Sequence, residues 1–245
     1  MPITNTARRE ESRDELVSLR GEVERWLARR RKADVRGQYA SQLRALDDVV
    51  RDAAARLAAA LEGVDPARPA DELFEACRAA DGRTLWLRRV WEFFREKFDQ
   101  RDDPALAPAL AAADEVVWSC YRQPFAIGEG GGERAFAGGR TAPLPFLESR
   151  LSPEAYPRDL VPAGLLAERD AFLRDVLNAL PIPVLRLPRA AARAPGWLVL
   201  VAHEAGHHVQ HDAGGGRLVG AFRALVTKAA EGAGAPDAER WADWT

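Results

Sequence analysis

Between residues 16 and 57, apolar side chains recur at alternating intervals of three and four. The positions are Leu16, Leu19, Val23 and Trp26, followed by Leu43, Leu46, Val50, Ala53 and Leu57. Residues with this spacing lie on one face of an α-helix, so the pattern predicts a long amphipathic helix or a helical hairpin. We expect a helical, coiled-coil-like module over residues 1–64, with a seam that packs within the molecule and an outer surface open to a protein partner. The composition of residues 63–69 then predicts an interruption of the helical pattern.

The composition bounds the class of protein. The chain has 245 residues, of which 47% are hydrophobic, and can therefore bury a substantial core. A net charge of −2 provides no global basic field, so neither nucleic acid nor an anionic membrane is an expected partner. The sequence has no apolar run that approaches a membrane span and no secretory apolar region, and its two cysteines form no disulfide framework. These observations favour the cytoplasm.

From residue 65 to residue 188, helical patterns alternate with stretches rich in glycine and proline. Helical spacing predicts helices over residues 71–80, 84–98, 104–121 and 165–180. Residues 123–162 predict a mobile loop with little regular structure, because they contain glycine runs followed by five prolines. Alternating residues between bracketing prolines predict a short strand at a sheet edge over residues 181–188. The expected fold is therefore mostly α, of the α+β type, with a small sheet.

All four histidines of the chain lie between residues 203 and 212. His203 and His207 are four positions apart, so one helical face presents both imidazoles to a single ion, with Glu204 beside them. Residues 197–202 before them are apolar on all sides, which is typical of a buried helix. The spacing predicts a Zn²⁺ site, because zinc prefers imidazole nitrogens held in this way.

A catalytic zinc site uses three protein ligands, so a third residue is expected elsewhere. Glu239 is favoured, because Asp243 lies four positions later on the same face of a helix opened by Pro236. Asp243 could then accept a hydrogen bond from a ligand histidine and orient it. An acidic helix start gives an alternative explanation for both acids. His211 is a weaker candidate ligand, since the helix turns it away from His203.

Other side chains fit the metal less well. His208 is expected to be a neighbour of the site or a surface residue. Cys77 and Cys120 lie far upstream without a recognisable ligand context, and Ala213 stands where the metzincin pattern needs its third histidine.

Two motifs carry a resemblance to a known family. Residues 203–207 read His-Glu-Ala-Gly-His, and residues 239–243 read Glu-Arg-Trp-Ala-Asp. Together they resemble the HExxH and ExxxD pair of the gluzincin zinc metallopeptidases. The Glu-x-x-Ala-Asp form is similar to that of the prenyl-protein endopeptidase class, whose membrane spans this sequence lacks. The resemblance covers roughly the last fifty residues.

The resemblance implies a zincin-like metallopeptidase domain over residues 65–245, with the loop 123–162 inside it. The implied zinc ligands are His203, His207 and Glu239, and Asp243 would accept a hydrogen bond from a ligand histidine. Glu204 would act as general base, taking a proton from the attacking water and passing it to the leaving amine.

The resemblance also implies a zinc-dependent endopeptidase that acts on a peptide or protein substrate. In this family an edge strand upstream of the zinc helix pairs with extended substrate, which here points to Val184, Leu185, Arg186 and Leu187. For an oxyanion-stabilising residue the chain offers only weak candidates, Tyr156 and Arg158.

The alternative is a non-enzymatic helical scaffold or interaction protein, in which the zinc site is structural or has decayed. Glu204 favours the enzyme, because a purely structural site has no use for that carboxylate.

Overall fold

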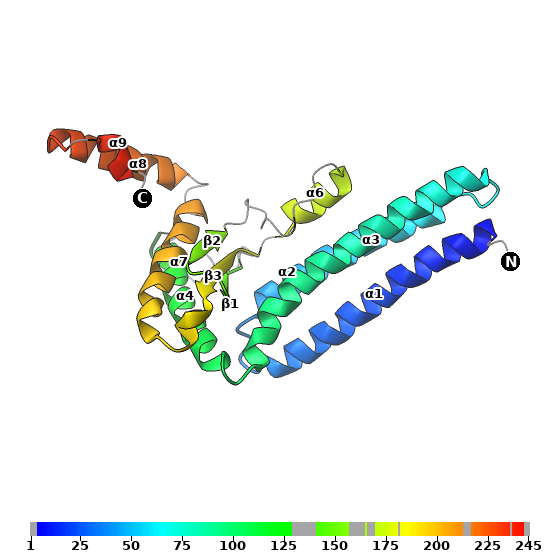
Figure 1. The fold of residues 1–245 in the computed structure, drawn as a ribbon, viewed down its shortest axis with the longest axis horizontal. Helices are drawn as coiled ribbons and strands as arrows, with labels where there is room; N and C mark the ends of the chain where they lie inside the picture. Colours follow the sequence, from blue (N-terminus) through cyan, green and yellow to red (C-terminus); the bar gives the residue numbers. More distant parts are fainter. Residues whose placement is uncertain are drawn as a thin grey trace. The chain divides into compact units, whose positions relative to one another are not determined.

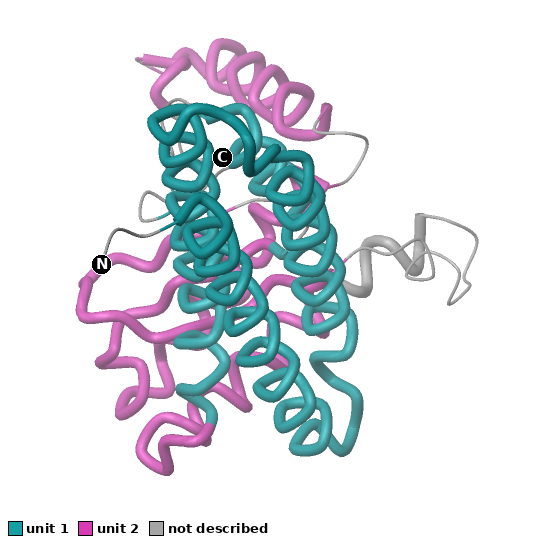
Figure 2. Tube along the Cα trace, turned by 90° about the vertical axis from the view of Figure 1, so that its right-hand side faces the viewer, with its two compact units in different colours: residues 1–101, 158–182 teal, residues 102–157, 183–245 magenta. Residues whose placement is uncertain are grey.

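The computed structural model describes residues 4–128, 141–156, 165, 170–180, 182–212, 217–235 and 237–242. The chain divides into two compact units, drawn in teal and magenta in Figure 2. Unit 1 comprises residues 1–101 and 158–182, and unit 2 comprises residues 102–157 and 183–245. The fold is mostly helical with one three-stranded mixed sheet, which confirms the predicted α+β class.

Unit 1 is built on three long helices, each of which packs against the other two (Figure 1). They are α1 (Asn5–Ala33), α2 (Ala40–Glu62) and α3 (Ala70–Asp99). The apolar seam predicted for the first two helices is confirmed, since all nine of its side chains are buried. Trp26 of α1 lies edge-on against Trp91 and Phe98 of α3, with ring centroids 6.4 and 5.7 Å away. A shorter helix, α6 (Ala171–Asn178), lies within the predicted range 165–180.

A continuous α3 replaces the two helices predicted over residues 71–80 and 84–98. Gly82 is exposed and has nothing within 4 Å of the place where a Cβ would lie, so it costs the helix only about 1 kcal/mol. The Thr84 hydroxyl donates to the Ala80 carbonyl at 3.0 Å, spanning the glycine. Apolar side chains of α3 are buried both before and after Gly82, and their burial outweighs the cost of glycine within the helix.

The break predicted over residues 63–69 is the turn between α2 and α3. Because α3 packs on both α1 and α2, the boundary between the compact units falls between Arg101 and Asp102 rather than between residues 64 and 65. A 3₁₀ turn, η1 (Gln100–Asp102), spans this boundary.

Unit 2 places two helices on one face of the small sheet. Its elements are α4 (Ala107–Gly128), β1 (Leu144–Glu148), β2 (Glu154–Tyr156), β3 (Val184–Pro188), the 3₁₀ turns η3 (Arg189–Ala192) and η4 (Pro195–Trp197), α7 (Leu198–Asp212), α8 (Arg217–Gly232) and α9 (Ala238–Ala242). The strand order is β1-β3-β2, with β3 parallel to β1 and antiparallel to β2. Leu185 and Leu187 of β3 share a core with Leu110 of α4 and with Val201 and Ala205 of α7. This core holds α7 against the sheet.

Regular structure also runs into residues 123–162, which corrects the prediction of an irregular loop there. The helix α4 continues to Gly128, and β1 and β2 both lie within the range. Pro145 is tolerated in β1 because the Leu144 N–H donates toward β3, to the Pro183 carbonyl at 2.9 Å, and the next nitrogen points away from β3. Residues 129–140, which carry most of the mobile-loop prediction, lie outside the described residues.

The strand predicted over residues 184–187 is confirmed, but its predicted edge position is wrong. Strand β3 has β1 on one side and β2 on the other, and all five of its residues are buried. Val184, Leu185 and Arg186 have a strand on each side, so extended substrate finds no open edge along them, whereas Leu187 pairs with β1 alone among the described residues. Alternation and bracketing prolines identify a strand without revealing how many neighbours it has.

Candidate metal centre

The predicted histidine-bearing helix is confirmed as α7, which follows directly after η4. Only one side of it is buried, the side that carries Val201, Glu204, Ala205 and His208. Val199 is 73% exposed, so the prediction of a helix buried on all sides is wrong. The sequence run is apolar all round, but in the described residues the core of α4 and the sheet covers a single face.

His203 and His207 lie on the more open side of α7, where His203 is exposed and His207 is half-buried. Their Nε2 atoms are 3.2 Å apart, and the two rings are nearly perpendicular, at 83°. Two nitrogens bound to one tetrahedral zinc ion at 2.0–2.1 Å would be separated by about 3.3 to 3.4 Å. The pair therefore fits two corners of a zinc site with little movement of either ring.

Gln210 lies behind His207 on the same helix. The Nδ1 atom of His207 is 3.1 Å from the Gln210 Oε1 atom, within hydrogen-bond range. An imidazole that donates from Nδ1 keeps the lone pair on Nε2, the nitrogen that faces His203. Sequence reasoning missed Gln210, although its position three residues after a candidate ligand is a usable signal.

Glu204 follows His203 and is 9% exposed. Within the described part of the chain, no hydrogen bond or ion pair engages its carboxylate. Its oxygens are not among the buried side-chain atoms of the described residues that lack a partner, so they reach solvent. This is what a group that must exchange a proton with water requires.

The other two histidines of α7 differ from each other. His208 is buried on the same side of the helix as Val201 and Ala205, so of its two predicted places, a neighbour of the site or the surface, the surface is wrong. One turn later, Asp212 accepts a hydrogen bond from the Tyr121 hydroxyl of α4. His211 is half-buried, and among the described residues no group of three His, Cys, Asp or Glu side chains is arranged to hold a metal.

The predicted third ligand is not brought to the histidine pair. Glu239 is exposed on α9, a short helix that packs on α8. A helix is therefore present at the predicted place, while Pro236 and Asp243 lie outside the described residues. The path of the chain between α7 and α9 decides where Glu239 lies, and helical spacing alone carries no information about that path.

Tyr156 and Arg186 form a polar cluster on the sheet. Arg186 of β3 is 5% exposed and donates from Nη1 to the Tyr156 hydroxyl at 2.9 Å and from Nη2 to Glu154. The Tyr156 hydroxyl donates to Glu154 at 2.8 Å. Burial raises the pKa of Tyr156, and its bond to Glu154 raises it further. The hydroxyl of this oxyanion candidate is thus already engaged, and Arg158 lies outside the described residues.

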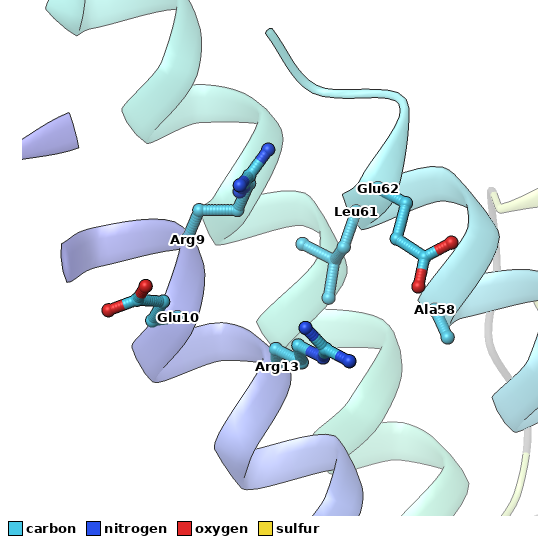
Figure 3. A pocket seen from close by; sticks show the side chains of 6 residues that line it. All are labelled: Arg9, Glu10, Arg13, Ala58, Leu61 and Glu62. Atoms are coloured by element: carbon cyan, nitrogen blue, oxygen red, sulfur yellow. The ribbon is translucent and has the colours of Figure 1, made fainter. Parts of the chain in front are cut away.

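Unit 1 has a pocket between α1 and α2, shown in Figure 3. Its lining residues are Arg9, Glu10, Arg13, Ala58, Leu61 and Glu62. Two arginines and two glutamates line it, so the formal charges of its side chains balance.

Comparisons of this chain with protein-family models, with curated proteins and with solved structures found no match. In the described part of the chain, no helix has both the length and the apolar character needed to cross a membrane.

Proposed function

We propose that this protein is a zinc-dependent endopeptidase with a zincin-like core and an active centre on α7. The observation that carries the proposal is the approach of the His203 and His207 Nε2 atoms to 3.2 Å on one helical face. Glu204, between them in sequence, adds a carboxylate without a partner among the described residues. A structural site would need the imidazoles but would have no use for that carboxylate.

Each residue has a defined role in the proposal. His203 and His207 hold Zn²⁺ through Nε2, and Gln210 lies behind the second of them. Zinc bound there supplies Lewis acidity, which polarises the scissile carbonyl and the attacking water. Glu204 accepts the proton that this water loses and then delivers it to the departing amine nitrogen.

The third ligand is the open part of the proposal. Only its sequence motif supports Glu239 as the third ligand, because the structure does not bring Glu239 to the histidine pair. If Glu239 binds the metal, Glu239→Ala should lower zinc affinity strongly while His211→Ala leaves it unchanged. The reverse ordering, measured by competition with a chelator, would assign the third position to His211.

A peptide substrate is supported by strand β2, which contacts α7 and has one sheet partner among the described residues, β3. A strand with one open side can hydrogen-bond to an extended peptide, which the central β3 cannot do. We therefore move the proposed peptide-pairing position from residues 184–187 to residues 154–156.

Glu204→Gln tests the enzymatic role. The amide keeps the size of the side chain but cannot accept the proton, so we expect unchanged zinc content and cleavage of a mixed fluorogenic peptide library slowed by about 10²- to 10⁴-fold. Gly206→Ala is the matched control on the same helix, since a Cβ there meets nothing within 4 Å. It should retain both zinc and cleavage.

Two outcomes would count against the peptidase. If Glu204→Gln cleaves as fast as the unmodified protein, Glu204 is not the base. If the unmodified protein binds zinc and cleaves no peptide, the non-enzymatic helical scaffold with a structural zinc site is the better description.

A further inference from the structure

Zinc binding through Nε2 requires the proton of a neutral imidazole to be on Nδ1. An acceptor placed at Nδ1 selects that tautomer and also stops the ring from rotating. A candidate ligand with such an acceptor is therefore prepared for the ion before it arrives, and a ligand without one is not.

We propose that Gln210 is the positioning residue of this centre and that it prepares His207, but not His203, for the metal. The inference rests on the proposed function, in that zinc is the ion concerned. The Gln210 Oε1 atom is 3.1 Å from His207 Nδ1, and both residues are half-buried on one helix. Their separation of three positions places them on neighbouring turns, so the helix itself sets their register.

The orientation of the Gln210 amide decides the tautomer. With Oε1 facing the ring, His207 donates from Nδ1, and its Nε2 atom carries the lone pair. An amide turned the other way would present NH₂ to Nδ1 and would move the imidazole proton to Nε2, where it blocks the metal. The two orientations thus predict opposite proton positions on His207.

In the metal-free protein, His203 then has the opposite tautomer, with its proton on Nε2. Its Nε2 atom is 3.2 Å from the His207 Nε2 lone pair, so His203 donates from Nε2. For both rings to face an ion, this proton must leave Nε2 while another is gained at Nδ1. The exposure of His203 allows solvent to carry out the exchange, and no net proton is released. One ring of the pair is preset, and the other changes tautomer on binding.

The tautomers are measured directly by long-range ¹H–¹⁵N correlation spectra of the full chain, first free of zinc and then loaded. We expect His207 to carry its proton on Nδ1 in both states, and His203 to move its proton from Nε2 to Nδ1 when zinc is added. Spectra of both states are recorded in the same mildly alkaline buffer.

Two variants separate the role of the acceptor from a simple packing role. Gln210→Leu removes the acceptor and should release His207 to a mixture of tautomers and weaken zinc binding by about 10- to 100-fold. Gln210→Glu restores an acceptor of similar length and should keep the Nδ1–H form and the affinity. Circular dichroism at 222 nm shows whether α7 stays helical in each.

The proposal is overturned if Gln210→Leu leaves the His207 tautomer unchanged, or if the unmodified zinc-free protein carries the His207 proton on Nε2. These results concern the metal-free protein, so they stand apart from the proposed function. A protein with the expected tautomers that binds no zinc would contradict the zinc peptidase, while leaving the contact between Gln210 and His207 intact.

Discussion

Asp170 combines two roles in unit 1, as the N-cap of α6 and as the partner of an arginine on α3. One carboxylate oxygen accepts from the Phe172 N–H at 2.8 Å, and the other accepts from Arg83 Nε at 2.9 Å. Burial alone would raise the pKa of Asp170, but Arg83 and the backbone N–H groups outweigh it and hold that pKa below its ordinary value. The ionised form is therefore favoured by folding.

We predict that Asp170→Ala lowers the free energy of unfolding by about 1 to 2 kcal/mol at pH 7. The folded pKa lies below the unfolded one, so this contribution is fully present above the ordinary value of 3.8 and is lost as the pH falls through the folded pKa. Urea unfolding at pH 7 and near pH 3 should show the difference from the unmodified protein shrinking. An equal difference at both pH values would mean that ionisation of Asp170 does not contribute.

At the scale of elements, the sequence was a good guide wherever one periodic pattern covers a whole helix. The seam of α1 and α2 repeats its spacing several times, so burial of one face follows from the pattern. The helix α7 was predicted from its histidine spacing, and the pair of nitrogens it brings together agrees with that spacing. In both cases the determining contacts are local in sequence.

The failures concern contacts that are distant in sequence. Strand β3 is central because β1 forms within a proline-rich stretch about forty residues upstream, and nothing in residues 184–188 reports that partner. Glu239 depends in the same way on the path of the chain through α8. Gln210 was missed for another reason, since a single polar residue at helical spacing carries little signal until its distance to His207 is known.

The continuity of α3 across Gly82 can be tested by replacing this glycine with alanine. Alanine at this open helical position should raise the free energy of unfolding by about 0.5 to 1 kcal/mol, because glycine loses more backbone entropy on folding. Gly37 is the contrasting position, since its φ of +66° disfavours any side chain although space is available. Gly37→Ala should therefore destabilise the protein by a similar amount in chemical unfolding. Destabilisation by Gly82→Ala would contradict a continuous α3, and stabilisation by Gly37→Ala would contradict the left-handed backbone at that position.

In the whole molecule, each of the two compact units has its own buried side chains. The helix that carries the candidate metal centre, α7, belongs to unit 2. Leu46 of α2 and Leu185 of β3 are both fully buried, one in each unit. Each leucine-to-alanine change should cost about 2 to 5 kcal/mol. Only Leu185 shares a core with α7, so only Leu185→Ala should lower zinc affinity.

Zinc titration at 25 °C, with thermal unfolding recorded on the same samples, checks this expectation. Leu46→Ala should lower the unfolding temperature and keep the zinc affinity of the unmodified protein. A parallel loss of affinity in both variants would show that the centre depends on unit 1 as well.

We propose that α7 holds one zinc ion through His203 and His207, whose Nε2 atoms are 3.2 Å apart. Zinc per chain, measured by elemental analysis of the purified protein after dialysis, tests it most directly, with Gly206→Ala as the control on the same helix. We predict one zinc ion in the unmodified protein and in the control, and almost none when His203 and His207 are both replaced by alanine, because two of the bonds to the ion are then gone. Zinc retained at one ion per chain in the double variant would contradict the claim.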